Sequence, residues 1–94
     1  MEYKIKELTR TEVKHRFIKI RYNVIDEFPP KNTQFTLKIG DESDSVSIDN
    51  LSRLWPHKRL NSKIIWQREA DITISKESDD VFVLTQHISE KTDN

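Results

Sequence analysis

Apolar residues recur at every second position in several segments of this chain, and this two-residue period constrains the fold more than any other feature. Phe35, Leu37 and Ile39 alternate with threonine and lysine, and Ile72 and Ile74 alternate with polar residues in the same way. Successive side chains of a β-strand point to opposite faces of its sheet. The period therefore predicts half-buried β-strands rather than helices.

Two pairs of these segments predict β-hairpins. A polar cluster at residues 40–44 separates 35–39 from 46–48, and a second cluster at 76–80 separates 72–75 from 81–84. Glycine, serine and aspartate favour tight turns because they tolerate or hydrogen-bond the turn backbone. The segment 81–84 is apolar on both faces, so we expect a central strand, or one whose outer face is covered by another element or another chain.

The two predicted hairpins align with each other at an offset of 35 residues. One interpretation is an old duplication that produces a pseudo-twofold barrel. The other is two independent solutions to the same turn, because the shared residues are the common turn and β-branched types. The sequence leaves both interpretations open.

Further strands and turns are predicted outside the hairpins. Alternation predicts a weak first strand around residues 3–8, a long strand over 15–25, and a strand over 63–68 in which Ile64 and Trp66 face the core. A turn is expected at Pro29 and Pro30.

Two short helical turns are also expected. Thr9 and Glu12 have the spacing of a capping box, and Asp49 or Asn50 is placed to cap a helical turn over 51–55 that Pro56 ends. The fold class is therefore predicted as all-β, a small barrel or pseudobarrel of six to seven short, mainly antiparallel strands with one or two short helical turns.

Length and composition narrow the class of protein. The 94 residues predict a single β-rich domain over residues 1–86, followed by a polar C-terminal tail over 87–94. The absence of cysteine excludes disulfides, thiolate nucleophiles and thiolate metal ligands. The amino terminus is charged from its second residue and no apolar run approaches membrane-spanning length, so we expect a cytoplasmic protein without membrane contact.

The charges are unevenly distributed although the net charge is zero. Residues 51–68 contain five cations, both tryptophans and no acidic residue, and residues 1–22 are also predominantly basic. Cations beside large aromatic side chains are typical of phosphate-binding surfaces. Alternatively, basic and acidic segments neutralise each other across neighbouring strands.

The basic segment predicts a non-enzymatic nucleic-acid-binding module, with DNA favoured over RNA because no aromatic RNA-recognition motif is visible. Phosphate contacts are expected in the loop between the two hairpins. Its tryptophan, Trp55, would stack on an unpaired base or wedge against a sugar. A second basic stripe lies on one strand face. The predicted nucleic-acid-binding residues are Arg53, Trp55, His57, Lys58, Arg59 and Lys63 in the loop, with Lys19 and Arg21 in the stripe. The prediction depends on whether Lys19 and Arg21 lie beside residues 58–63 or face the acidic residues of 41–49.

The alternative function is a protein-interaction or oligomerisation module. Phe82 and Leu84 would dock a protein partner or a second copy of the chain, and a sheet edge would pair with a partner strand. The competing expectation is that the domain itself covers both side chains.

No catalytic residue, cofactor or metal ligand is predicted. The acidic clusters lie in predicted turns, where aspartate serves the backbone. His15, His57 and His87 have no metal-ligand spacing, so neither zinc binding nor an enzymatic activity is expected.

Overall fold

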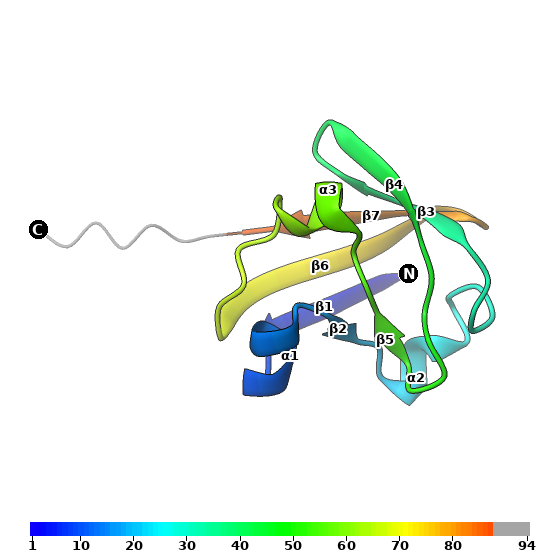
Figure 1. Ribbon diagram of the computed structural model, residues 1–94. Coiled ribbons are helices and arrows are strands. Elements are labelled where there is room, and N and C mark those ends of the chain that lie inside the picture. Colours follow the sequence, from blue (N-terminus) through cyan, green and yellow to red (C-terminus); the bar gives the residue numbers. More distant parts are fainter. Residues whose placement is uncertain (88–94) are drawn as a thin grey trace, which may run out of the picture.

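A computed structural model describes residues 1–87 and shows a small, mostly β-stranded domain with two sheets (Figure 1). The larger sheet is mixed, with strand order β1-β6-β7-β3-β4, and the smaller one pairs β2 with β5. The strands are β1 (Glu2–Glu7), β2 (Ile18–Lys19), β3 (Phe35–Ile39), β4 (Glu42–Val46), β5 (Arg53–Leu54), β6 (Glu69–Ser78) and β7 (Val81–Gln86). The helices are α1 (Arg10–His15), α2 (Tyr22–Ile25) and α3 (Lys58–Asn61).

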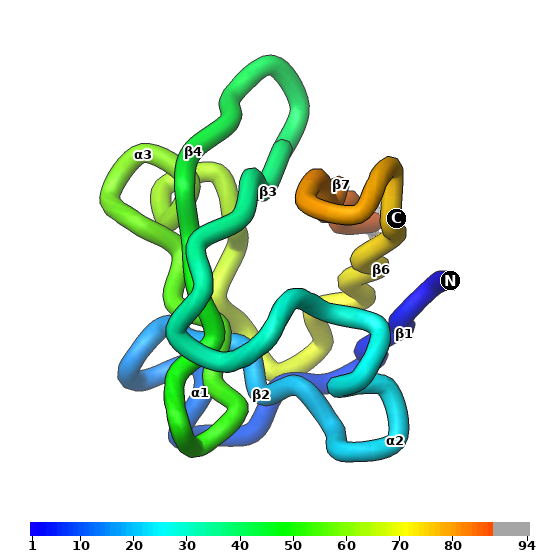
Figure 2. The backbone as a smooth tube through the Cα atoms, turned by 90° about the vertical axis from the view of Figure 1, so that its right-hand side faces the viewer, coloured from blue at the N-terminus to red at the C-terminus, as the bar shows by residue number. Residues whose placement is uncertain are grey.

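The β-rich class and the short strands are confirmed, but the described chain forms no closed barrel. The larger sheet ends at β1 on one side and at β4 on the other, and its strands do not pair across that gap within residues 1–87. The pairing is antiparallel except between β3 and β7. In Figure 2 the chain curls around a common centre, with α1, β2 and α2 in the lower part of the view.

Both predicted hairpins form. β3 and β4 pair from Phe35↔Val46 to Ile39↔Glu42, and β6 pairs with β7 in antiparallel register. Gly40 lies between β3 and β4 with φ of +59°, a conformation that glycine adopts without a steric penalty. β7 lies between β6 and β3, which confirms the central strand expected from its two apolar faces.

The arrangement of the hairpins does not fit a pseudo-twofold axis. A twofold axis between them would place two equivalent strands side by side in antiparallel orientation. Here the second strand of one hairpin, β7, runs parallel to the first strand of the other, β3. The two hairpins are therefore not related by a twofold axis in the fold.

The long strand predicted over residues 15–25 is wrong, because helical turns interrupt it on both sides of β2. The capping box predicted at Thr9 and Glu12 is present: the Thr9 hydroxyl accepts from the Glu12 N–H at 3.2 Å, and the Glu12 carboxylate accepts from the Thr9 N–H at 2.8 Å. These bonds satisfy N–H groups that a helix start leaves free, so α1 forms ahead of β2. β2 pairs with β5 through only two residues, and α2 begins at Tyr22, so the strand ends there.

Two further local predictions are corrected. The helical turn expected at 51–55 is replaced by β5, whose backbone pairs with β2, and a helical turn occurs instead at α3. Residues 63–68 form no strand, because this segment has no partner strand in the sheet. Its apolar side chains still serve the core: Ile64 is buried, and Trp66 packs against the core while its Nε1 donates to the Asn61 side chain at 3.0 Å.

The core contains the two side chains proposed above as a docking surface. Phe82 and Leu84 are 0% and 1% exposed. The Phe82 ring stacks on Phe28 with centroids 4.7 Å apart, and its centroid lies 5.3 Å from that of Phe35. The predicted protein interface at Phe82 and Leu84 is therefore corrected: the domain itself covers both side chains, and Val81 on the other face of β7 is half-buried.

Only the first residue of the predicted polar tail belongs to the described chain. The His87 N–H donates to the Asp71 carbonyl at 3.0 Å, which continues the β6–β7 pairing by one residue. Residues 88–94 lie outside the described part. Within residues 1–87, the helices are too short to span a membrane.

Candidate nucleic-acid interface

The structure separates the predicted cations into two groups. Lys19 lies directly opposite Arg53 in the β2–β5 pair, and Arg21 follows Lys19 by two residues. Lys58 and Arg59 belong to α3, which packs beside β4 at the opposite end of the molecule (Figures 1 and 2). The basic stripe at Lys19 therefore lies beside Arg53 and not beside residues 58–63.

The α3 group faces acidic residues. Arg59 Nε lies 3.6 Å from the Glu42 carboxylate of β4, and Asp44 lies on the same strand. His57, Lys58 and Lys63 are exposed around this contact. For Arg59, this contact corresponds to the alternative in which basic and acidic segments neutralise each other.

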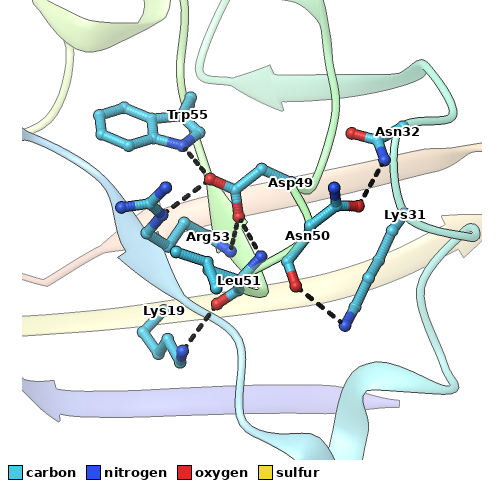
Figure 3. Close-up of polar contacts among 8 residues, drawn as sticks. All are labelled: Lys19, Lys31, Asn32, Asp49, Asn50, Leu51, Arg53 and Trp55. Carbon is cyan, nitrogen blue, oxygen red and sulfur yellow. Dashed lines mark hydrogen bonds and ion pairs between the residues drawn. The ribbon is translucent and has the colours of Figure 1, made fainter.

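The second group gathers around the loop at residues 49–53. Lys19 Nζ donates to the Leu51 carbonyl at 2.6 Å, and Lys31 Nζ donates to the Asn50 carbonyl at 3.3 Å (Figure 3). We call the surface formed by Lys19, Arg21, Lys31 and Arg53 the basic end. Lys31 was missed by the sequence analysis, although its place directly after a Pro-Pro turn indicated an exposed loop cation.

Asp49 organises the loop between these lysines. Its carboxylate accepts from the N–H groups of Leu51 and Arg53, from Arg53 Nε at 2.7 Å and from Trp55 Nε1 at 2.9 Å (Figure 3). Ser52 adopts a φ of 61°, and its N–H closes the turn on the Asp49 carbonyl. Partial burial raises the pKa of Asp49, but the hydrogen bonds from Trp55, Arg53 and Leu51 outweigh it and lower the pKa to about 2.

Trp55 contributes to this scaffold. Its ring lies 4.9 Å from the Phe17 ring, and the Arg53 guanidinium lies 5.3 Å from the Trp55 centroid and 5.6 Å from that of Phe17. The indole N–H is already donated to Asp49. These contacts favour a structural role for Trp55 over the predicted stacking on a base.

Two buried side chains fix the backbone of β2. The Glu12 carboxylate accepts from the Lys19 N–H at 2.8 Å. The Tyr3 hydroxyl donates to the Lys19 carbonyl at 2.9 Å and accepts from the Arg21 N–H at 3.3 Å. Burial, the largest effect, raises the pKa of Tyr3 despite the hydrogen bond from Arg21, so the hydroxyl keeps its proton as a donor. Two cations of the basic end, Lys19 and Arg21, are therefore attached to a backbone held by side-chain hydrogen bonds, which reduces the entropy lost on binding a ligand.

An open depression of about 570 Å³ adjoins the basic end. It is lined by Lys19, Ile20, Arg21, Tyr22, Asn23 and Ser52. Tyr22 is 89% exposed, although it continues the two-residue alternation of Ile18 and Ile20, which are both buried. The sequence analysis missed Tyr22 and Asn23 as site residues; the signal that could have found them is the adjacency of a cation, an aromatic and an amide in residues 21–23.

Comparison with known proteins gives a similarity of fold but no family. No family model matches the chain, and no curated protein sequence matches it significantly. Among solved structures, the chain is similar to the N-terminal domain of Helicobacter pylori LlaJI.R1, with a TM-score of 0.76 and 13% sequence identity. The similarity covers 98% of this chain and 91% of that one. At this identity the likeness establishes a shared fold.

Proposed function

We propose that this chain is a non-enzymatic DNA-binding module that contacts phosphates through the basic end. The observation that carries the proposal is the pairing of β2 with β5, which places Lys19 opposite Arg53. Lys31 and Arg21 add cations from two further segments around the same loop. Clustered cations on one end of a neutral protein attract the DNA backbone and orient the protein on it.

The chemistry of these side chains suits phosphate. A lysine ammonium has three donors, and Lys19 and Lys31 each use one on a loop carbonyl, which leaves N–H groups for phosphate oxygens. Arg53 uses Nε on Asp49, and its terminal nitrogens make no hydrogen bond within residues 1–87. Asp49 offsets part of the Arg53 charge, so Lys19, Lys31 and Arg21 carry most of the attraction.

The fold comparison supports the same direction. LlaJI.R1 has the name of a restriction-system protein, a class whose work concerns DNA, and its N-terminal domain shares this fold. A shared fold does not by itself transfer a function. The proposal of DNA binding therefore rests on the cations of the basic end, and the following experiment tests it.

Binding of a short fluorescent DNA duplex is followed by anisotropy over a salt series, for the native protein and two double variants. Lys19→Gln with Arg21→Gln removes two cations from the basic end, and Lys58→Gln with Arg59→Gln removes two from the α3 group. Affinity for DNA falls as the salt concentration rises, and each lost phosphate contact makes the plot of log affinity against log salt concentration less steep by about 0.9. We expect the first variant to lose about two such contacts and the second to retain the native slope.

Thermal melting of both variants controls for folding. Two results contradict the proposal: the native protein binds no DNA at low salt, or both double variants lose affinity and slope equally. In the second case the attraction comes from overall charge and not from the basic end.

A further inference from the structure

We infer that the depression beside the basic end is a subsite for one unpaired nucleotide, with the base stacked on Tyr22. The inference rests on the proposed function and extends it, because phosphate binding alone requires neither an aromatic ring nor a recess. It concerns the surface that Lys19, Arg21, Tyr22, Asn23 and Ser52 form together.

Tyr22 has no visible role in folding. Its side chain is 89% exposed at the start of α2, and its hydroxyl has no hydrogen-bond partner within the described residues. By contrast, the other tyrosine, Tyr3, is buried. Its hydroxyl donates to the Lys19 carbonyl and accepts from the Arg21 N–H. A single exposed aromatic is unremarkable on a protein surface. Tyr22 differs because it borders a recess that also carries two cations.

The recess contains the groups that a nucleotide needs. Lys19 and Arg21 provide positive charge for a phosphate. The Asn23 amide and the Ser52 hydroxyl make no side-chain hydrogen bond within residues 1–87, so both can bond to the edge of a base. The volume of about 570 Å³ is within the range of small-molecule sites.

The rigidity of the surroundings supports a defined site. The Ile20 N–H donates to the Ser52 carbonyl at 2.8 Å, which ties the two walls together. Tyr3 holds the backbone of Lys19 and Arg21, as described above. The ring of Tyr22 is therefore presented from a fixed backbone while its own side chain is free to contact a ligand.

The ligand is an unpaired nucleotide because stacking on Tyr22 requires an accessible base face. Both faces of a base inside a duplex are covered by its neighbours, whereas a single strand or a displaced base exposes one. Stacking on an aromatic side chain is sequence-tolerant because every base has a π-face. Removing the aromatic ring typically lowers single-strand affinity by about 5- to 150-fold, equivalent to about 1–3 kcal/mol.

The test compares two single-stranded DNA oligonucleotides of equal length, one normal and one with an abasic stretch that keeps its phosphates. Tyr22→Ala is expected to weaken binding of the normal strand by about 5- to 150-fold and to leave binding of the abasic strand unchanged. Tyr22→Phe retains the ring and is expected to bind both strands like the native protein. Ile65→Ala, which truncates another exposed apolar side chain, is the matched control and is expected to change neither affinity.

The outcomes separate this inference from the proposed function. If Tyr22→Ala binds the normal strand as tightly as the native protein, or weakens both strands equally, the nucleotide subsite is overturned while DNA binding by the basic end stands. If the native protein binds neither oligonucleotide nor duplex at low salt, the proposed function fails and the subsite fails with it. Because Tyr22 is exposed, the variants are expected to fold, and melting curves verify this.

Discussion

Asp49→Asn should destabilise the domain by about 2 kcal/mol at neutral pH, because it removes the charge on which the 49–53 loop is assembled. The folded-state pKa of Asp49 is about 2, compared with an ordinary value of 3.8. At about 1.4 kcal/mol per pKa unit, this difference corresponds to roughly 2.4 kcal/mol. The side chain is 26% exposed, so water screens part of this energy and about 2 kcal/mol is expected. A charge-assisted hydrogen bond contributes about 1.5–3 kcal/mol by itself, which gives the same magnitude.

The pH dependence distinguishes the charge from simple loss of packing. Because the pKa is lower in the folded state, the unfolded chain binds more protons between about pH 5 and pH 2. The stabilisation by Asp49 is complete above about pH 5 and is lost as the pH falls through about 2. The difference between native protein and Asp49→Asn should therefore shrink from about 2 kcal/mol to below about 0.5 kcal/mol over this range.

Urea unfolding followed by tryptophan fluorescence at several pH values measures this difference. Asp41→Asn is the control, since Asp41 is exposed in the β3–β4 turn and its carboxylate has no hydrogen bond within the described chain. It should change stability by less than about 0.5 kcal/mol. The reasoning is refuted if Asp49→Asn matches that control at pH 7, or if its effect is the same at pH 7 and at pH 2.5, where about two thirds of the stabilisation should be lost.

Tyr3→Phe removes the hydroxyl that bridges Lys19 and Arg21 and should cost about 1 kcal/mol in urea unfolding. Tyr22→Phe, which removes an exposed hydroxyl, should cost almost nothing, and equal costs for the two variants would contradict the bridging role. Phe82→Ala should destabilise the domain by about 3–5 kcal/mol, enough to unfold much of it, because Phe82 is fully buried. A variant that stays folded but changes mass in sedimentation would instead restore the docking role proposed for this residue.

The sequence determines the strands whose partners are close along the chain. The hairpins at residues 35–46 and 69–86 form where alternation and turn residues predict them, because their pairing is local. The capping box at Thr9 and Glu12 is local for the same reason. Part of the candidate site was also predictable, since Lys19, Arg21 and Arg53 stand out as cations in predominantly basic segments.

The long-range pairing of β2 with β5 could not be predicted, and it decides the site. It brings Lys19 opposite Arg53 across more than thirty positions of chain, whereas Arg59 lies at β4 with Glu42. The same pairing ends the alternation after Ile20, so that Tyr22 turns outward although its sequence spacing predicts burial.

Local composition thus determines the two hairpins and which segments are basic, because turn chemistry and alternation act over a few residues. The tertiary structure alone decides which cations share a surface and which aromatics are free. Those outcomes depend on contacts between segments far apart in the sequence, such as Tyr3 with Lys19 and Lys19 with Leu51, which no single segment can form by itself.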